Sequence, residues 1–238
     1  SSAASDVYKR QVKATILDLR YNAGGSLDCV QLLATILVPS ARMGTPMAYL
    51  EYNDKNIDKS TTIDFDQEVL KTGTNLNQNV LIVITSGTTA GAAEMLLTSL
   101  YKKDQYPNII VMGSASKGQT VATEQFINET YRWSVNPVVC TVYNSDHVAG
   151  EEPFILTPSD QFKISETSID GTTNYSQFLP FGDPKERMLS IAIQTLEGTY
   201  PPKDEDKEEE TPSTKSFKIE KNVSSPASRR FAGGLRIK

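Results

Sequence analysis

The 238-residue sequence predicts an α/β core with a mixed, partly parallel sheet and flanking helices. A β-rich run, VKATILDLR at 12–20, leads through the glycine turn YNAGGS into a segment at 27–38 with apolar residues at helical spacing. The apolar run NVLIVITS at 79–86 has the length of a buried strand, and a helical pattern at 89–103 follows it. Strands and helices that alternate in this way build a parallel sheet, and ligands bind at the carboxyl ends of its strands.

Further strands are predicted where β-forming residues recur between polar segments. The stretch at 54–78 is rich in Asp, Asn, Lys and Thr, and we expect it to be a surface excursion. The predicted strands lie at 46–53, 108–113, 120–128 and 131–144, and the last two are expected to form an antiparallel pair.

The strongest helix signal lies at 183–198. Asp183 is placed to cap its N-terminus, Pro184 to occupy the first helical position and Gly198 to follow the last residue. This helix is expected to close the core.

Both ends of the chain differ from the core, which we expect to span residues 12–200. Residues 1–11, SSAASDVYKRQ, back-translate into a string that resembles a transposase sequencing adapter. We therefore interpret them as non-native and the chain as a metagenomic fragment, in which a signal sequence is not expected to be visible. Residues 201–238 are first acidic and then basic, without apolar periodicity, and are predicted to form a disordered tail.

Composition argues against several classes of function. A net charge of −5 disfavours nucleic-acid binding, and no apolar run approaches the roughly 20 residues that span a bilayer. The single histidine, His147, rules out a multi-histidine metal site, and we expect neither a metal nor a cofactor. His147 lies in a polar loop and is expected to be solvated, with a catalytic role as the alternative. Cys29 and Cys140 are expected to be buried free thiols, with a disulfide as the alternative.

Three loops at the carboxyl ends of predicted strands carry the candidate site. Gly24 and Gly25 expose backbone N–H groups, which suits an oxyanion hole or a phosphate cradle, although most such pairs are simple turns. Glu94 follows the small residues of 86–91 near a helix start, either as part of the site or as an ordinary helix-start acid. Lys117 follows a buried strand, where desolvation would make it a usable base, and an exposed loop lysine is the alternative.

In their order and spacing, these segments resemble the carboxyl-terminal processing, or tail-specific, serine peptidases. The strand, double glycine and helix of TILDLRYNAGGSLDCVQLLATILVP are similar to one family motif. VITSGTTAGAAE is similar, without gaps, to the nucleophile segment, VMGSASKGQT to the lysine loop, and GDPKERMLSIAIQTLEG to the closing helix. The resemblance covers about residues 12–198, is nearest to versions from Bacteroidetes-type bacteria, and implies a ClpP/crotonase-like core.

The resemblance also implies roles for individual residues. In this family a serine attacks the peptide carbonyl and a lysine is the general base. These positions correspond to Gly91 and Lys117. Some members orient the lysine with a glutamine where this chain has Val121, and Gln119 is the nearest candidate.

The oxyanion hole of the family uses backbone N–H groups rather than side chains. The resemblance places these groups at Gly24 or Gly25 and at Ala92, the residue after the nucleophile position.

Gly91 departs from the family pattern because it removes the attacking oxygen, a loss that costs about 10⁶-fold in a well-studied serine protease. Three explanations stay open: a natural pseudopeptidase that binds peptides, a sequence error one transition away from a serine codon, or substitution by a neighbouring hydroxyl. The neighbouring hydroxyls are those of Ser86, Thr88 and Thr89. The resemblance therefore implies a serine-type endopeptidase domain that uses a Ser-Lys dyad to cleave peptide bonds near protein C-termini. The alternative is a catalytically dead peptide-binding module.

The resemblance further implies polypeptide substrates or protein C-terminal tails as partners. Family members carry a PDZ-like or helical N-terminal domain, and we expect none of it before residue 12. Relatives act in the cell envelope or periplasm, and the same location is expected here.

Overall fold

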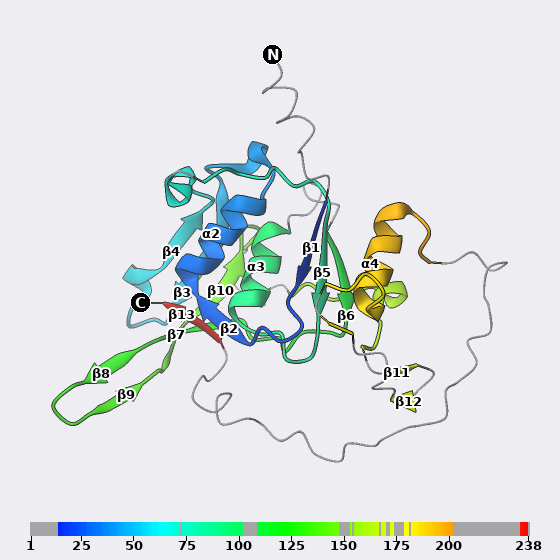
Figure 1. Ribbon diagram of the computed structural model, residues 1–238. Helices are drawn as coiled ribbons and strands as arrows, with labels where there is room; N and C mark the ends of the chain where they lie inside the picture. The colour runs from blue at the N-terminus through cyan, green and yellow to red at the C-terminus, as the bar shows by residue number, and fades with distance from the viewer. Residues whose placement is uncertain are drawn as a thin grey trace.

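The computed structural model describes residues 14–71, 73–101, 109–147, 153, 155–166, 168–169, 172–173, 179–180, 182–201 and 234–237. These residues form successive layers: a mixed sheet, two helices, a parallel sheet and a further helix (Figure 1). The predicted α/β class with mixed pairing is confirmed, although the strands are divided between separate sheets. The segment at 1–11 and most of the predicted tail lie outside the described residues.

A three-stranded parallel sheet lies at the centre of the layers. Its strands are β1 (Thr15–Asp18), β5 (Leu81–Thr85) and β6 (Ile109–Gly113), in the order β1-β5-β6. Every residue of β5 is buried, because alternate side chains enter the hydrophobic clusters on its two faces. Burial on both faces explains why this segment is a continuous apolar run rather than an alternating one.

A six-stranded mixed sheet forms an outer layer. In spatial order its strands are β2 (Gly24–Ser26), β13 (Gly234–Ile237), β7 (Val121–Glu124), β10 (Val138–Asn144), β3 (Pro46–Tyr52) and β4 (Thr61–Asp64). The predicted antiparallel pair is confirmed, since β10 pairs antiparallel with both β7 and β3. Between β7 and β10, the hairpin of β8 (Phe126–Asn128) and β9 (Trp133–Val135) projects from the body (Figure 1).

Helices α2 (Leu27–Leu37) and α3 (Ala92–Leu100) pack in the core between the two sheets. The Ser26 side chain caps α2 by accepting the Cys29 N–H, as expected for a serine directly after a glycine turn. None of the helices in the described part of the chain has the length and apolar character needed to cross a bilayer. The remaining short elements are η1 (Ser40–Arg42), η2 (Ile57–Lys59), η3 (Gln67–Leu70), η4 (Asp160–Phe162), β11 (Ser168–Ile169) and β12 (Thr172–Thr173).

Helix α4 (Arg187–Glu197) covers the other face of the parallel sheet, but it begins later than predicted. Its N-cap is Glu186, whose carboxylate accepts the Leu189 N–H at 2.9 Å. Asp183 instead accepts the Lys185 N–H and so closes the turn before the helix. The prediction for the C-terminus is confirmed, because Gly198 has the left-handed conformation that ends the helix.

Two polar segments contain more structure than their composition predicted. The supposed surface excursion at 54–78 includes β4 and Phe65, which is fully buried with the Arg42 guanidinium 4.9 Å from its ring centre. The supposed disordered tail includes β13, which pairs with two strands and buries Leu235 between them. In each polar segment one apolar residue, Phe65 or Leu235, is buried in the core.

The end of β1 is held by a buried ion cluster. Arg20, only 5% exposed, donates to both carboxylate oxygens of Asp18 and to Glu166 and Glu186. Burial opposes the ionisation of Asp18, but hydrogen bonds from Arg20 outweigh it and hold the pKa of the carboxyl below its usual value. The cluster connects the loop after β1 to the N-terminus of α4.

The two cysteines should react very differently. Both are free, but Cys29 is exposed whereas Cys140 is buried in β10, and burial raises the pKa of its thiol to about 11. At pH 8 we expect Cys29 to react with Ellman's reagent at least about 100-fold faster than Cys140, because the thiolate is the reactive form. Equal rates in the native protein would contradict this placement, and guanidinium should make the two rates similar.

Gly113 should tolerate no side chain. Its φ is +112°, and a Cβ there would lie 2.2 Å from the Thr85 carbonyl oxygen. We expect Gly113→Ala to lower the free energy of unfolding by at least about 2 kcal/mol, measured by urea denaturation. Gly87→Ala is the matched control, since a Cβ at Gly87 meets nothing within 4 Å, and equal effects of the two substitutions would refute the packing of β6 against β5.

Candidate active site

The turn between β5 and α3 has the geometry of a nucleophile turn. Gly91 is buried at the N-cap of α3 with φ 54° and ψ −107°. Positive φ is a strained conformation for any residue other than glycine, and nucleophiles on strand-to-helix elbows occupy sharp, strained turns. The backbone at Gly91 therefore has a conformation that such an elbow can adopt.

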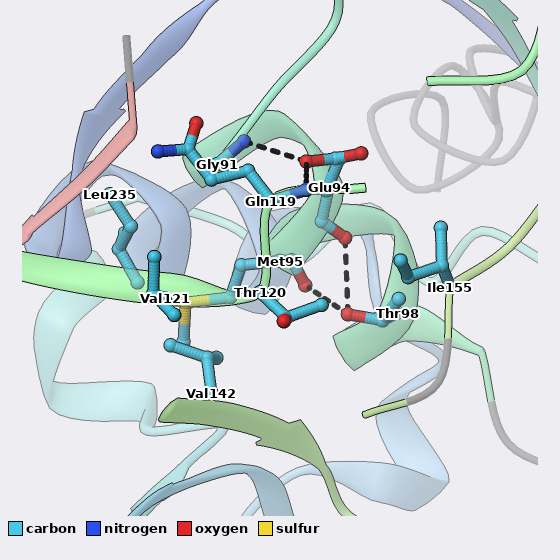
Figure 2. A pocket seen from close by; sticks show the side chains of 10 residues that line it. All are labelled: Gly91, Glu94, Met95, Thr98, Gln119, Thr120, Val121, Val142, Ile155 and Leu235. Atoms are coloured by element: carbon cyan, nitrogen blue, oxygen red, sulfur yellow. Dashed lines mark hydrogen bonds between the residues drawn. The ribbon is translucent and has the colours of Figure 1, made fainter. Parts of the chain in front are cut away.

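Glu94 holds this turn and the lysine loop together. Its carboxylate is 4% exposed and accepts three backbone N–H groups: Gly91 at 2.9 Å, Gly118 at 2.6 Å and Gln119 at 2.8 Å (Figure 2). Charge-assisted bonds of this kind are stronger than neutral ones. Glu94 is thus a positioning residue of the site rather than an ordinary helix-start acid.

The three loops that the sequence singled out meet at this turn. The Ala90 N–H donates to the Asn22 carbonyl at 3.0 Å, which joins the glycine loop to the turn. The Lys117 N–H donates to the Thr89 carbonyl at 2.9 Å, which joins the lysine loop. The three loops, each at the carboxyl end of its strand, therefore lie together.

The double glycine lies directly beside the start of α3. A Cβ on Gly25 would come within 3.3 Å of the Ala92 Cβ, so glycine permits a close approach there. The Gly24 N–H donates to Asn22 Oδ1 at 3.1 Å and is therefore already engaged. Ala92, as the first residue of the helix, has no intrahelical acceptor for its N–H.

The lysine loop places its backbone inward and Lys117 outward. The Lys117 side chain is exposed, so the structure shows the exposed loop lysine of the two alternatives and not the desolvated one. The cause is the hold of Glu94 on the next two N–H groups, which directs the main chain rather than the lysine toward the turn. Gln119 is partly buried, and its side chain extends past Gly91 (Figure 2).

The neighbouring hydroxyl groups are committed to structural hydrogen bonds. Ser86 and Thr88 both donate to the Arg20 carbonyl, the latter at 2.7 Å. Thr89 donates to the Leu19 carbonyl at 2.7 Å and accepts the Ser86 N–H. These bonds tie the turn to the end of β1, so the structure does not support a neighbouring hydroxyl as a replacement nucleophile.

A narrow pocket opens beside Gly91. Apolar side chains from α3, β7, β10 and β13 line most of it, and Glu94, Thr98 and Gln119 add polar groups. Figure 2 shows Leu235 from β13 and Val121 from β7 on one side of Met95. The free space in it is about 10 Å³, roughly the room that one water molecule needs, so the lining side chains already fill most of it.

His147 takes no part in this arrangement. Its ring stacks on that of Tyr49 of β3, with the ring centres 5.0 Å apart. The centre of the Tyr143 ring of β10 lies 3.9 Å from the His147 ring centre. It is half-buried by these tyrosines, so the expectation of a solvated loop histidine is wrong. Within the described residues, no group of three or more His, Cys, Asp or Glu side chains is arranged to hold a metal ion.

Two positioning features escaped the sequence analysis. The DLR segment was noted as a motif, but its Arg20 was not identified as the centre of an ion cluster. The contribution of β13 to the pocket was missed as well, and no signal near the loops indicates that a distant segment returns there.

Removing the charge of Glu94 should loosen the site. In Glu94→Gln, the amide NH₂ cannot accept the backbone N–H groups, so at least one of the three buried donors loses its partner. We expect the free energy of unfolding to fall by about 1–3 kcal/mol in chemical denaturation. Glu197→Gln, on an exposed position of α4, is the control, and equal stability of the two variants would refute the role assigned to Glu94.

Comparisons with known proteins agree with this geometry. The model of peptidase family S41 matches residues 1–151. A protein from Bacteroides fragilis NCTC 9343 described as an S41 protease is 35% identical at a TM-score of 0.68, over 83% of this chain and 50% of its own. The chain therefore spans about half the length of that relative.

Two other solved structures are more distant. A lipoprotein from Streptococcus agalactiae is 23% identical at a TM-score of 0.47, over 64% of this chain and 51% of its own. A photosystem II D1 C-terminal processing protease is 20% identical at a TM-score of 0.43, over 69% of this chain and 38% of its own. No curated protein matches the chain significantly. The family match covers more than half of the sequence, and it agrees with the three motifs and their convergence at Gly91: the chain belongs to peptidase family S41.

Proposed function

We propose that this domain is a serine-peptidase core that takes polypeptide chains near their carboxyl termini, and that with Gly91 it binds them without forming an acyl-enzyme. The observation that carries the proposal is the conformation of Gly91, with φ 54° at the N-cap of α3. Family S41 membership supports the peptidase class and, with it, a polypeptide ligand.

The chemistry of the intact site follows from the positions of its groups. A serine hydroxyl at position 91 would attack the peptide carbonyl from the tip of the turn, and Lys117 would accept its proton. The N–H groups of Gly25 and Ala92 would stabilise the developing oxyanion, helped by the positive end of the α3 dipole. Gln119 is the candidate to orient the lysine, and the exposed Lys117 would have to turn toward position 91.

The alternative is that this chain cleaves its substrate by another nucleophile. The hydrogen bonds of Ser86, Thr88 and Thr89 to backbone carbonyls favour the binding role instead. Whether glycine at position 91 reflects evolution or a sequence error does not alter what the chain with Gly91 is expected to do. The proposal includes an envelope location, which rests on the family resemblance alone.

Restoring the hydroxyl should restore covalent reactivity. We expect Gly91→Ser to be labelled by a fluorophosphonate probe and to cleave a denatured protein, whereas the unmodified chain does neither. The gain should exceed about 10³-fold, because loss of a nucleophile costs up to about 10⁶-fold. The measurement is label incorporation by intact-mass spectrometry together with peptide release.

Two controls make this result specific. Gly91→Ala carries the same backbone strain without a hydroxyl and should stay unlabelled, while both substitutions should cost about 1–3 kcal/mol of stability. Gly91→Ser combined with Lys117→Ala should lose most of the reactivity if Lys117 is the base. A folded Gly91→Ser chain that is neither labelled nor active would overturn the peptidase assignment of the turn.

A further inference from the structure

Strand β13 fills a slot in the mixed sheet. It pairs parallel with β2 on one side and with β7 on the other, with Leu235 opposite Gly25 and Ala122. Among the described strands, β2 has no other partner, so β13 alone joins the glycine loop to the sheet. Figure 1 shows β13 between β2 and β7, far in sequence from both.

One side chain anchors this strand. Leu235 is 1% exposed and lies in the pocket that Gly91 also lines. The Leu235 carbonyl accepts the Thr123 hydroxyl at 3.2 Å, and main-chain pairing supplies the other polar contacts. A backbone ladder with one buried aliphatic side chain is the usual way in which a sheet recognises an extended peptide.

The slot coincides with the place where a peptidase must hold its substrate. A segment in it runs alongside Gly25, the candidate oxyanion donor, and places a side chain next to the nucleophile position. We propose that the slot between β2 and β7 is a peptide-binding site, and that β13 is its occupant in cis. This assignment of the slot to substrate rests on the proposed function, whereas the occupancy by β13 rests on the strand pairing alone.

The contacts of β13 define the class of ligand. The residue opposite Gly25 is expected to be aliphatic, because Leu235 is buried at that position and lines the same pocket as Met95 and Val121. The preceding residue is Gly234, opposite Gly24, so a small residue is expected there. The slot should therefore accept an extended segment with a small residue followed by leucine, parallel to β2.

The strand is built to be displaced. It has only four residues, and parallel pairing is slightly less stable per residue than antiparallel pairing. Residues 202–233 connect it to the rest of the chain, and their dense charge without apolar periodicity is typical of a linker. Tethering keeps β13 at a high effective concentration, so a free peptide competes poorly until the cis strand is weakened.

The test compares peptide binding by two full-length chains. The probe is a fluorescent peptide with the sequence of residues 233–238, Gly-Gly-Leu-Arg-Ile-Lys, measured by anisotropy. Leu235→Asp weakens the cis strand, and we expect this variant to bind the peptide at least 10-fold more tightly than the unmodified chain does. A probe with aspartate in place of leucine should bind neither chain. Leu196→Asp, at a 40% exposed position of α4, is the matched control and should behave like the unmodified chain.

A folded Leu235→Asp chain that fails to bind the peptide overturns the inference. If this variant does not fold, hydrogen exchange on the unmodified chain decides instead. If β13 is displaceable, the amides of residues 235–237 exchange at least 10-fold faster than those of β5. Exchange at the same rate as β5 would mark β13 as an integral strand and overturn the inference.

The outcome is separable from that of the proposed function. Peptide binding by Leu235→Asp, with Gly91→Ser left unlabelled, supports the slot and rejects the peptidase turn. Labelling of Gly91→Ser, with no peptide bound by Leu235→Asp, supports the peptidase turn and rejects the slot.

Discussion

The candidate site depends on the carboxylate of Glu94. Two loops that have no covalent reason to lie together, the turn at Gly91 and the loop at Gly118, share it as a hydrogen-bond acceptor. Buried backbone N–H groups must find partners, and a charged acceptor satisfies three of them at once. This attachment binds the backbone of the lysine loop to the start of α3, while the Lys117 side chain stays exposed.

The sheets bring these loops within reach of Glu94. Because β5 is buried on both faces, its carboxyl end is fixed relative to the helices on each side. Gly113 lets β6 end against Thr85, and Gly25 lets β2 approach Ala92. The Arg20 cluster fixes the remaining neighbour, the loop after β1. Together these contacts hold the glycine loop, the turn at Gly91 and the lysine loop in one place.

Much of this could be predicted from the sequence, and the misses have physical causes. The apolar run of β5 and the three loops were predictable because local pattern and burial agree there. The N-cap of α4 was misplaced because Asp183 and Glu186 both have capping chemistry, and only the tertiary ion pair with Arg20 selects Glu186. Phe65 and β13 were missed because single apolar residues in polar segments are buried by distant partners.

The most direct test of the central claim is the hydrogen exchange of three amides in the unmodified chain. If Glu94 holds the site together, the N–H groups of Gly91, Gly118 and Gln119 are protected to a similar degree, although two of them belong to a surface loop. NMR exchange rates at these residues should lie well below those of exposed loop amides, and Glu94→Ala, which removes both carboxylate oxygens, should raise all three together. Rapid exchange at Gly118 and Gln119, with only Gly91 protected, would contradict the account.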